Sequence, residues 1–348
     1  MPTNPSLRLP AEWEPHAFTQ ITWPSLNSDW DYMMEQVEEC YVNIVKAILS
    51  FEPLLIVTDD VERVRRILGE SLASRVHLFA CPINDTWARD HAFITLLSPN
   101  SRATLADFQF NGWGLKFAAD KDNLINSRLF HSILNGNDYQ DSLRIVLEGG
   151  SIESDGHGTI LTTTNCLLAP NRNCFASKAE AEDTLLPALH ADRMLWVDHG
   201  LLQGDDTDGH VDTLVRFAPN DFIVYVAPPA DTSDPQYPSL LAMQDDIRAL
   251  RTVDGKPYNL IPLPSVPPVY DPDDNSRLPA TYANFYFLNG GILVPTYNVS
   301  TDAEALDVMS RAFPNLKVLP VDCRALIRQH GSLHCSTMQY PVNVNLNI

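Results

Sequence analysis

Apolar runs typical of buried strands recur along the chain, and each follows a stretch typical of a helix, which predicts an α/β fold. Five such helix-then-strand pairs are predicted. Their helices lie at about 60–73, 123–134, 177–190, 236–250 and 302–313, and their strands begin at residues 75, 143, 193, 258 and 316. Near the N-terminus we expect a strand at 18–23, a helix at 29–50 that Asp29 caps, and a strand at 53–57.

Hairpin-like pairs of apolar segments lie between these units: 145–153 with 159–168, 213–217 with 222–227, and 284–288 with 292–297. The first and third pairs are joined by strong turn sequences, DGHG at 155–158 and NGG at 289–291. No Gly/Ser-rich linker divides the chain, and the Pro-rich stretch 262–279 is interpreted as a surface loop. The sequence therefore predicts one domain, residues 1–348, of repeated β-β-α-β units.

Residues suited to chemistry follow the predicted strands. Asp90 comes shortly after the first of the five, Glu148 directly after the second, His210 and Asp212 after the third, and Cys335 after the fifth. In α/β proteins ligands bind beyond the carboxyl ends of the strands. If the five units pack around one axis, these side chains converge on a central cavity.

Composition and charge limit the partners. The 348 residues are 45% hydrophobic and 20% charged, with no run of eighteen apolar residues to cross a membrane. The N-terminal segment lacks the features of a signal peptide and six cysteines make no disulfide framework, so we expect a cytoplasmic protein with reduced thiols. A formal charge of −20 disfavours nucleic acid and anionic membranes and permits a small cationic substrate, although an acidic surface also serves solubility alone.

The segment GHVDTLVRF at 209–217 is interpreted as a strand. Alternation would then place His210 and Asp212 on one face and Val211, Val215 and Phe217 on the core face. An imidazole beside a carboxylate suits acid–base catalysis, but equally an exposed pair or part of a metal site. A metal centre would need more ligands at matching spacing, so it is the minority interpretation.

Two further carboxylates have settings that differ from an ordinary exposed strand end. Glu148 ends an apolar run and precedes two glycines, which let the backbone approach a ligand or simply turn. By strand alternation Asp90 would lie on the same side as Ala92 and Ile94, in a partly enclosed region. The alternative for Asp90 is a structural ion pair with Arg89.

Cys335 lies between small and polar residues, in the segment GSLHCST. A free cysteine is usually a small core residue, but one thiol, one imidazole and three carboxylates together suit a guanidinium substrate. Two carboxylates can grip this planar cation along two edges. Its delocalised carbon needs a strong nucleophile such as a thiolate, with an acid to expel ammonia and a base to activate water. The set favours hydrolysis of a guanidine to a urea through a covalent thiouronium intermediate.

Short blocks recur in order along nearly the whole chain: LPAEWEP at 9–15, DTWARD at 85–90, FNGWG at 110–114, LEGGSIE at 147–153, NRN at 171–173, GDDTDGHVD at 204–212, PATYANF at 279–285 and HGSLHC at 330–335. In this order they resemble the agmatine deiminases, of the guanidine-modifying (pentein) superfamily that also includes bacterial peptidylarginine deiminase. One departure is Ala92-Phe93, where many relatives carry Gly-Pro or Gly-Ala. This difference would alter the lip of the pocket and touches no catalytic group that the resemblance implies.

The resemblance implies a five-bladed α/β propeller with pseudo-fivefold symmetry, in agreement with the five predicted units. It implies no metal and no organic cofactor. The expected reaction converts agmatine to N-carbamoylputrescine and ammonia, a step of putrescine biosynthesis. Trp87 is expected to wall the substrate pocket.

The same resemblance implies roles for the other motif residues. Cys335 would be the nucleophile and His210 the general acid and base. Asp90 and Asp212 would clamp the guanidinium, and Glu148 would bond to a substrate nitrogen or orient His210.

Three alternatives stay open. A peptidylarginine deiminase, or a deiminase of another small guanidine, would use the same core. A catalytically dead ligand-binding propeller is disfavoured because the thiol, the imidazole and the three carboxylates named above are all present. A thiol protease is disfavoured because three carboxylates around a thiol have no role in acyl transfer. The sequence does not rank Glu12, Asp205, Asp206 and Asp208 as partners for the far amine, and it is compatible with a homo-oligomer without deciding the oligomeric state.

Overall fold

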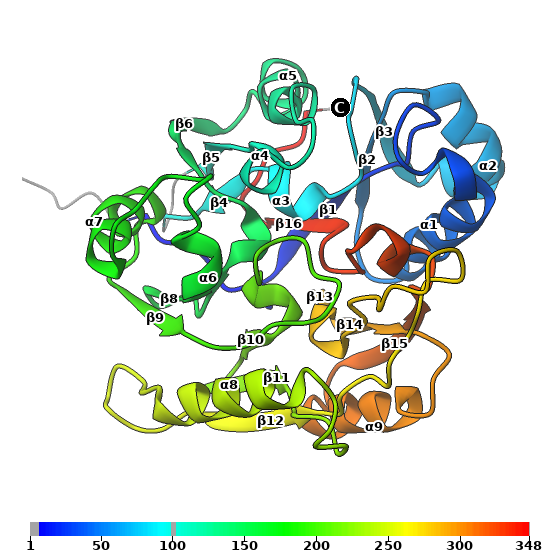
Figure 1. The fold of residues 1–348 in the computed structure, drawn as a ribbon. Coiled ribbons are helices and arrows are strands. Elements are labelled where there is room, and N and C mark those ends of the chain that lie inside the picture. The colour runs from blue at the N-terminus through cyan, green and yellow to red at the C-terminus, as the bar shows by residue number, and fades with distance from the viewer. Residues whose placement is uncertain (1–6, 99–101, 348) are drawn as a thin grey trace, which may run out of the picture.

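Five separate β-sheets follow one another around the centre of the molecule in the computed structural model, which describes residues 7–98 and 102–347 (Figure 1). In every sheet an antiparallel pair of strands is followed by a parallel strand, and a helix makes the crossover. The predicted α/β class and the β-β-α-β plan are therefore confirmed. No helix of the described residues is both long and apolar enough to cross a membrane.

Four sheets have three strands each. Their strands are β4 (Ile94–Leu96), β5 (Thr104–Gln109) and β6 (Asp138–Val146); β7 (Ile152–Ser154), β8 (Thr159–Thr163) and β9 (Arg193–Val197); β10 (Val215–Ala218), β11 (Phe222–Val226) and β12 (Asn259–Leu263); and β13 (Tyr286–Leu288), β14 (Gly291–Thr296) and β15 (Lys317–Asp322).

The fifth sheet joins the two ends of the chain. Its strand order is β16-β1-β2-β3, with bounds β1 (His16–Thr22), β2 (Leu54–Thr58), β3 (Val76–Ala80) and β16 (Thr337–Pro341). The antiparallel pairing of β1 with β16 places the segment before β16, which contains Cys335, against elements from the first third of the chain.

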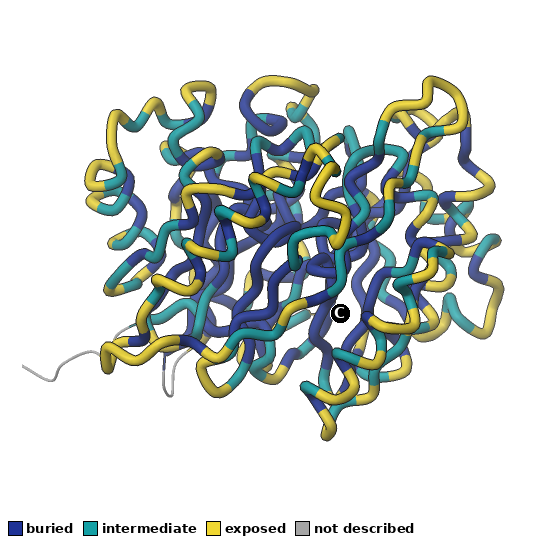
Figure 2. The backbone as a smooth tube through the Cα atoms, turned by 60° about the horizontal axis from the view of Figure 1, so that its bottom comes forward, coloured by how far each residue is buried: buried dark blue, intermediate teal, exposed yellow. Residues whose placement is uncertain are grey.

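Helices cover the sheets on the outside, and the strands nearest the centre are buried on both faces (Figure 2). The long helices are α1 (Met34–Ile48), α2 (Val61–Ala73), α5 (Ile125–Ser132), α7 (Lys178–Leu189), α8 (Tyr237–Ala249) and α9 (Asp302–Ala312). These bounds agree closely with the predicted helices. The exception is the start of the first one: a 3-10 turn occupies Asp31–Met33 and α1 begins at Met34, so Asp29 caps no helix.

Short helical turns lead into the first strand of each unit, and around Asp90, in 145–153 and in 209–217 they replace strand that the sequence predicted. They are α3 (Ala88–His91), and the 3-10 turns η3 (Gly149–Ser151), η4 (Val211–Thr213) and η5 (Tyr282–Asn284). Residues 333–336 form a comparable turn before β16. Along the chain, α3 packs on η3, η3 on η4 and η4 on η5, while α3 also contacts β16.

Two predictions made from strand alternation are therefore wrong. His210 and Asp212 do not share a strand face, because Thr213 N donates to His210 O and the strand begins at Val215. Asp90 lies in α3, where Asp90 N donates to Trp87 O, so it has no alternation partner in Ala92. The chain must turn from one sheet into the next at these points, and local helical bonds satisfy the backbone there.

The predicted hairpin of 145–153 with 159–168 is also shorter than expected. Residues 145–146 end β6 of the preceding sheet, and η3 separates them from β7. β7 alone pairs with β8. The predicted hairpins β10–β11 and β13–β14 are confirmed.

Candidate active site

The turns at the starts of the five units bring together the residues singled out in the sequence. Asp90 comes from α3, Glu148 precedes η3, and His210 and Asp212 come from η4 and the residue before it. Cys335 lies in the turn before β16. Of these five residues, Asp90 and Cys335 line a pocket, together with Asp29, Asp85, Trp87, Trp113, Phe117, Asp206, Thr207, Gln329, His330 and Gly331.

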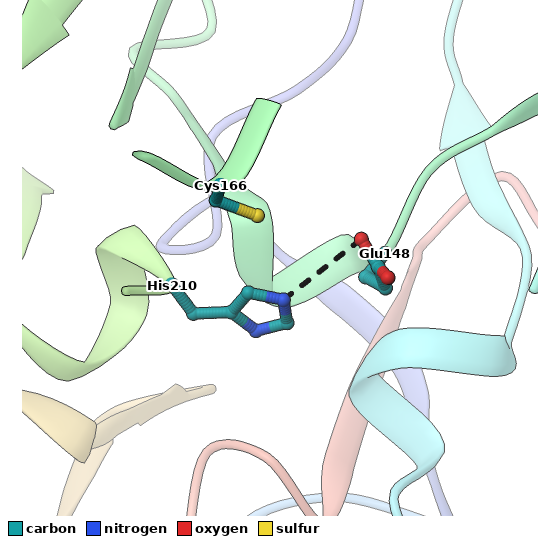
Figure 3. Close-up of side chains that lie close together, drawn as sticks. All are labelled: Glu148, Cys166 and His210. Carbon is teal, nitrogen blue, oxygen red and sulfur yellow. Dashed lines mark ion pairs between the residues drawn. The ribbon is translucent and has the colours of Figure 1, made fainter. Parts of the chain in front are cut away.

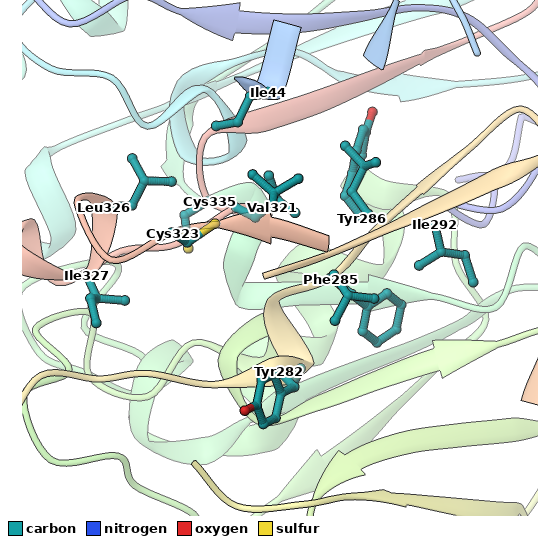
Figure 4. Close-up of a cluster of buried hydrophobic side chains, with 14 of the residues drawn as sticks. Ile44, Tyr282, Phe285, Tyr286, Ile292, Val321, Cys323, Leu326, Ile327 and Cys335 are labelled. Atoms are coloured by element: carbon teal, nitrogen blue, oxygen red, sulfur yellow. The ribbon is translucent and has the colours of Figure 1, made fainter. Parts of the chain in front are cut away.

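The thiol of Cys335 is held in place from several directions. Asn284, at the end of η5, donates from Nδ2 to the sulfur at 3.3 Å and accepts the backbone N–H of Cys335 at its Oδ1 (3.2 Å). The carbonyl of Cys335 accepts from Arg89 N. Behind the thiol is a cluster of buried apolar side chains that includes Phe285 and Leu326 (Figure 4). The sulfur therefore has little freedom to move away from the pocket.

Three of the other groups surround a single glycine. A Cβ atom placed on Gly150 would lie 2.7 Å from His210 Nδ1, 2.8 Å from Asp90 Oδ1 and 3.0 Å from Asp212 Oδ2. Because Asp212 Oδ2 is itself 3.8 Å from the sulfur of Cys335, these separations keep His210 Nδ1 within about 10 Å of the sulfur. The second glycine of the Glu-Gly-Gly sequence thus leaves room for an imidazole and two carboxylates.

Several polar atoms that face this space have no partner within the protein. His210 is fully buried, and neither of its ring nitrogens makes a hydrogen bond. Its Nδ1 is 3.7 Å from Asp90 Oδ1 and its Nε2 is 3.9 Å from Glu148 Oε2, both too long for hydrogen bonds. Asp212 Oδ1 is also buried and unpartnered. Buried polar atoms in native proteins are nearly always satisfied, so this arrangement is typical of a site completed by a polar ligand.

Each carboxylate is fixed by neighbours on its other side. Asp90 accepts from Trp113 Nε1 and from Gly150 N, both at 2.9 Å. Asp212 Oδ2 lies 2.7 Å from Nδ1 of His334. These bonds fix the orientation of both aspartates, and Asp90 also lines the pocket.

Glu148 is oriented by an arginine. Arg172 Nε donates to both of its carboxylate oxygens, at 2.9 and 3.0 Å, and Arg172 Nη1 donates to Asp208 at 2.7 Å. Both side chains of the Arg172–Glu148 pair are fully buried. This glutamate is thus held in one orientation with an oxygen directed at the imidazole.

Known proteins share both the sequence and this architecture. Residues 8–341 match the family described as Porphyromonas-type peptidyl-arginine deiminase. The chain belongs to this family. It is 32% identical to the agmatine deiminase of Pseudomonas aeruginosa, over 98% of this chain and 97% of that one.

Solved structures of relatives superpose over almost the full length of this family member. A Porphyromonas gingivalis protein provisionally named an arginine deiminase is 49% identical, with a TM-score of 0.91, over 97% of this chain and 99% of that one. A C. jejuni agmatine deiminase with substrate bound is 32% identical, with a TM-score of 0.89, over 98% of this chain and 97% of that one. The chain is therefore an enzyme of the guanidine-modifying class.

Burial and charge set the protonation of the central pair in this deiminase-family protein. Burial raises the pKa of the Cys335 thiol well above its ordinary value, and the carboxylates of Asp212 and Asp90 raise it further. Burial alone would lower the pKa of His210, but its neighbours, the Asp90 carboxylate first and then Cys166 and the Glu148 carboxylate, outweigh burial and raise that pKa well above its ordinary value. Without a ligand the site therefore holds a neutral thiol and a protonated imidazole.

The remaining predicted residues have varied positions. Trp87 lines the pocket, with its ring against Gly331 and its Nε1 bonded to Asp85. Arg89 pairs with Glu12, at 3.3 Å, rather than with Asp90, and both members of that pair are buried. The structural ion pair considered for Asp90 is therefore not formed.

Of the four acidic candidates for the far amine, Asp206 alone lines the pocket. Burial raises its pKa to about 6. Asp205 bonds to Thr207 and to Gly209 N within its own loop, and Asp208 pairs with Lys116 and Arg172. Glu12 lies in a buried network with Arg216, outside the pocket lining.

Five residues that contact the site received no role from the sequence: Trp113, Cys166, Arg172, Asn284 and His334. Four of them lie in blocks that carried the family resemblance, so their motifs were visible although their contacts were not. Trp113 reaches Asp90 from a left-handed turn, with φ values of 69°, 55° and 81° at Gly112, Trp113 and Gly114. A β-carbon on Gly112 would lie 2.2 Å from Phe117 O, which explains the glycine there.

Two groups of side chains have donors close enough for a metal ion among the described residues. In one group, Glu12, Glu153 and His334, the guanidinium of Arg216 already bonds to all three. The other group is Glu148, Cys166 and His210 (Figure 3), where the imidazole nitrogens are unpartnered.

Gly150→Ala is expected to lower kcat/KM on the order of 100-fold or more. The added methyl group must displace the imidazole or a carboxylate by several tenths of an ångström, and misplacing catalytic groups by small distances lowers the rate by this factor. Steady-state kinetics checks this. The matched control is Gly255→Ala, where the new methyl group meets nothing within 4 Å. At φ +76° that change costs about 1 kcal/mol of stability and leaves kcat/KM unchanged. Equal kinetics for the two variants would contradict the role given to Gly150.

Proposed function

We propose that this protein hydrolyses agmatine to N-carbamoylputrescine and ammonia, with Cys335 as nucleophile and His210 as general acid and base. The observation that carries the proposal is the unpartnered set of His210 nitrogens and Asp212 Oδ1 beside the buried Cys335 sulfur. These polar atoms are suited to bind a planar guanidinium cation whose central carbon is attacked by the thiol.

In the proposed complex, Asp90 and Asp212 hold the guanidinium along two edges. Asp212 has one oxygen 3.8 Å from the Cys335 sulfur, so an N–H bonded to Asp212 brings the guanidinium carbon near the thiol. The bound cation offsets the two carboxylates that raise the thiol pKa, so substrate itself favours the thiolate. The thiol proton passes to solvent when the cation binds, since His210 is already protonated, so substrate activates Cys335.

The reaction then proceeds in two halves. The thiolate forms a C–S bond to the guanidinium carbon, imidazolium His210 donates a proton to one nitrogen, and the C–N bond breaks to release ammonia. Neutral His210 next removes a proton from water, whose oxygen attacks the thiouronium carbon. The C–S bond then breaks and the hydroxyl proton of the intermediate passes to solvent, which returns the thiolate and releases the neutral ureido product. Glu148, held by Arg172, faces His210 Nε2 and stabilises the imidazolium form.

The choice of agmatine rests on the charge of the pocket. Four aspartates line it, and no described lining residue is Lys or Arg. The α-carboxylate of free arginine would thus meet acidic groups with no cation to pair with, whereas the far ammonium of agmatine would meet Asp206 and its neighbours. Trp87, Trp113 and Phe117 offer apolar walls for the methylene chain.

We also propose that the five sheets are the five blades of one catalytic propeller domain. The shared strand plan of the sheets and the contacts that run from α3 through η3 and η4 to η5 support this arrangement. It explains why residues from every third of the chain meet at one point.

A peptidylarginine deiminase is the second candidate, since the matched family carries that name. The two differ in what must fit beyond the guanidinium: a short aliphatic ammonium, or a polypeptide backbone. The burial of Cys335, which lines the pocket and is only 4% exposed, favours the smaller molecule.

We expect kcat/KM for agmatine to exceed that for free arginine by about 100-fold, the equivalent of one unpaired buried carboxylate at about 2–3 kcal/mol. It should also exceed that for a blocked arginine peptide, because the peptide backbone must fit where agmatine carries only a short ammonium chain. A colour assay for ureido products with the three substrates measures this. Asp206→Asn should raise KM for agmatine and lower KM for arginine, because it removes one of the charges that repel the α-carboxylate. A peptide turned over faster than agmatine would assign the protein to the second candidate.

A further inference from the structure

The proposed reaction makes no use of Cys166, although its thiol lies beside the acid–base pair. Cys166 belongs to the short helix α6 (Thr164–Leu167) and is fully buried. Thr163 accepts Cys166 N at its hydroxyl and donates to Gly209 O, which ties α6 to the residue before His210. The position of this thiol relative to the imidazole is thus fixed by the backbone.

A carboxylate, an imidazole and the Cys166 thiol, three kinds of metal-ligating group, lie close together. One ligand atom each of Glu148, Cys166 and His210 lies within 4.8 Å of the other two (Figure 3). The ring nitrogens of fully buried His210 are unpartnered, and Nε2 is 3.9 Å from Glu148 Oε2, beyond hydrogen-bond length. The sulfur of Cys166 and the carboxylate of Glu148 both point toward the imidazole (Figure 3).

This geometry is close to that of a zinc site. Zinc binds thiolate sulfur at about 2.3 Å and imidazole or carboxylate ligands at about 2.0–2.2 Å, which places tetrahedral donors about 3–4 Å apart. Small inward movements of the three side chains would reach these distances. Glu148 already accepts from Arg172, and carboxylates that ligate metals are commonly held by such hydrogen bonds.

We propose that Glu148, Cys166 and His210 bind one divalent cation of the zinc class, and that the bound ion inhibits the enzyme. On binding, the Cys166 thiol and the His210 imidazolium each release one proton to solvent, and the sulfur and the freed ring nitrogen each donate an electron pair to the ion, with no change of oxidation state. Water fills the fourth position. The inhibition rests on the proposed function, because the ion occupies the acid–base imidazole and places positive charge beside the guanidinium subsite.

Inhibition by Zn²⁺ in chelator-buffered solutions tests the consequence for turnover. The free Zn²⁺ concentration that halves agmatine turnover is expected to rise at least about tenfold in Cys166→Ser, since one strong ligand is lost. The exposed Cys174, changed to serine, is the matched control and should behave as wild type. An unchanged Zn²⁺ sensitivity of Cys166→Ser would overturn the proposal. If that variant folds poorly by circular dichroism, Cys166→Ala replaces it.

A second measurement does not depend on turnover. Co²⁺ is added to Cys335→Ser/Cys174→Ser protein, which lacks the other pocket thiol and the exposed one. A thiolate-to-cobalt charge-transfer band is expected, and it should disappear when Cys166→Ala is added. Absence of the band in the first protein, or its persistence in the second, would refute the site. If the wild-type protein does not turn over agmatine, that result would count against the proposed function, and the cobalt band would still test the metal site.

Discussion

Cys335→Ala is expected to lower kcat/KM for agmatine by about 10⁴-fold or more, since removal of a covalent nucleophile leaves only binding and electrostatic effects. The loss should appear in kcat, because the proposed role of the thiol begins after the guanidinium is bound. The variant should still bind agmatine, measured by calorimetry, because Asp90 and Asp212 remain. Continuous ammonia detection gives the rate.

The covalent step can be observed in the wild type. A brief reaction with agmatine followed by acid quench should leave the mass of an amidino adduct, agmatine minus ammonia, on the peptide that contains Cys335. Cys174→Ser serves as the control for adventitious modification, because that thiol is exposed. An adduct on another cysteine, or near-normal turnover by Cys335→Ala, would exclude the proposed nucleophile.

Asp212→Asn is expected to have two opposite effects. Turnover of agmatine should fall about 10³-fold, because one charged partner of a buried cation is removed, at a cost of about 3–5 kcal/mol. Alkylation of Cys335 by neutral iodoacetamide should become faster at a fixed pH near 7. The carboxylate, 3.8 Å from the sulfur, raises the thiol pKa, so its loss lowers that pKa and increases the thiolate fraction.

The pH profile of alkylation makes this second effect quantitative. In wild type the rate should still be rising above pH 9, because burial and the two aspartates hold the thiol pKa well above its ordinary value. The midpoint should move to lower pH in Asp212→Asn. Asp245→Asn, an exposed change on α8, is the matched control and should leave the midpoint in place. An unchanged midpoint in Asp212→Asn would show that this carboxylate does not set the thiol pKa.

Positioning of the acidic groups depends on residues that lie behind them. His334 bridges Asp212 and Glu12, with its two ring nitrogens 2.7 and 2.6 Å from their carboxylates. Arg216 in turn bonds to Glu12 and Glu153, all within the buried interior. The Asp212 carboxylate thus ends a buried chain of hydrogen-bonded polar groups, which fixes its orientation before substrate arrives.

Local sequence patterns were enough to predict the secondary structure of most of the chain. The long helices and outer strands repeat an amphipathic or apolar pattern, so α7, α8, α9 and β9 fall within a residue or two of their predicted bounds. The same reasoning failed at the unit entrances, because the whole segment 209–217 has the alternation of a strand, while residues 211–213 form a 3-10 turn and the strand begins only at Val215. Tertiary packing of turn on turn decided its conformation.

The chemistry was visible in the sequence because it depends on residue type: a thiol, an imidazole and carboxylates in motif blocks, typical of a guanidine-modifying enzyme. What each side chain contacts was not visible, since Asn284, Arg172 and Cys166 are 51, 163 and 169 residues from Cys335 in the chain. Their contacts arise only when five sheets bring their entrance turns to one point. The sequence by itself determined the class of reaction and the α/β repeat, whereas the tertiary structure decided which atoms remain unpartnered for a ligand, because that depends on packing between segments far apart in the chain.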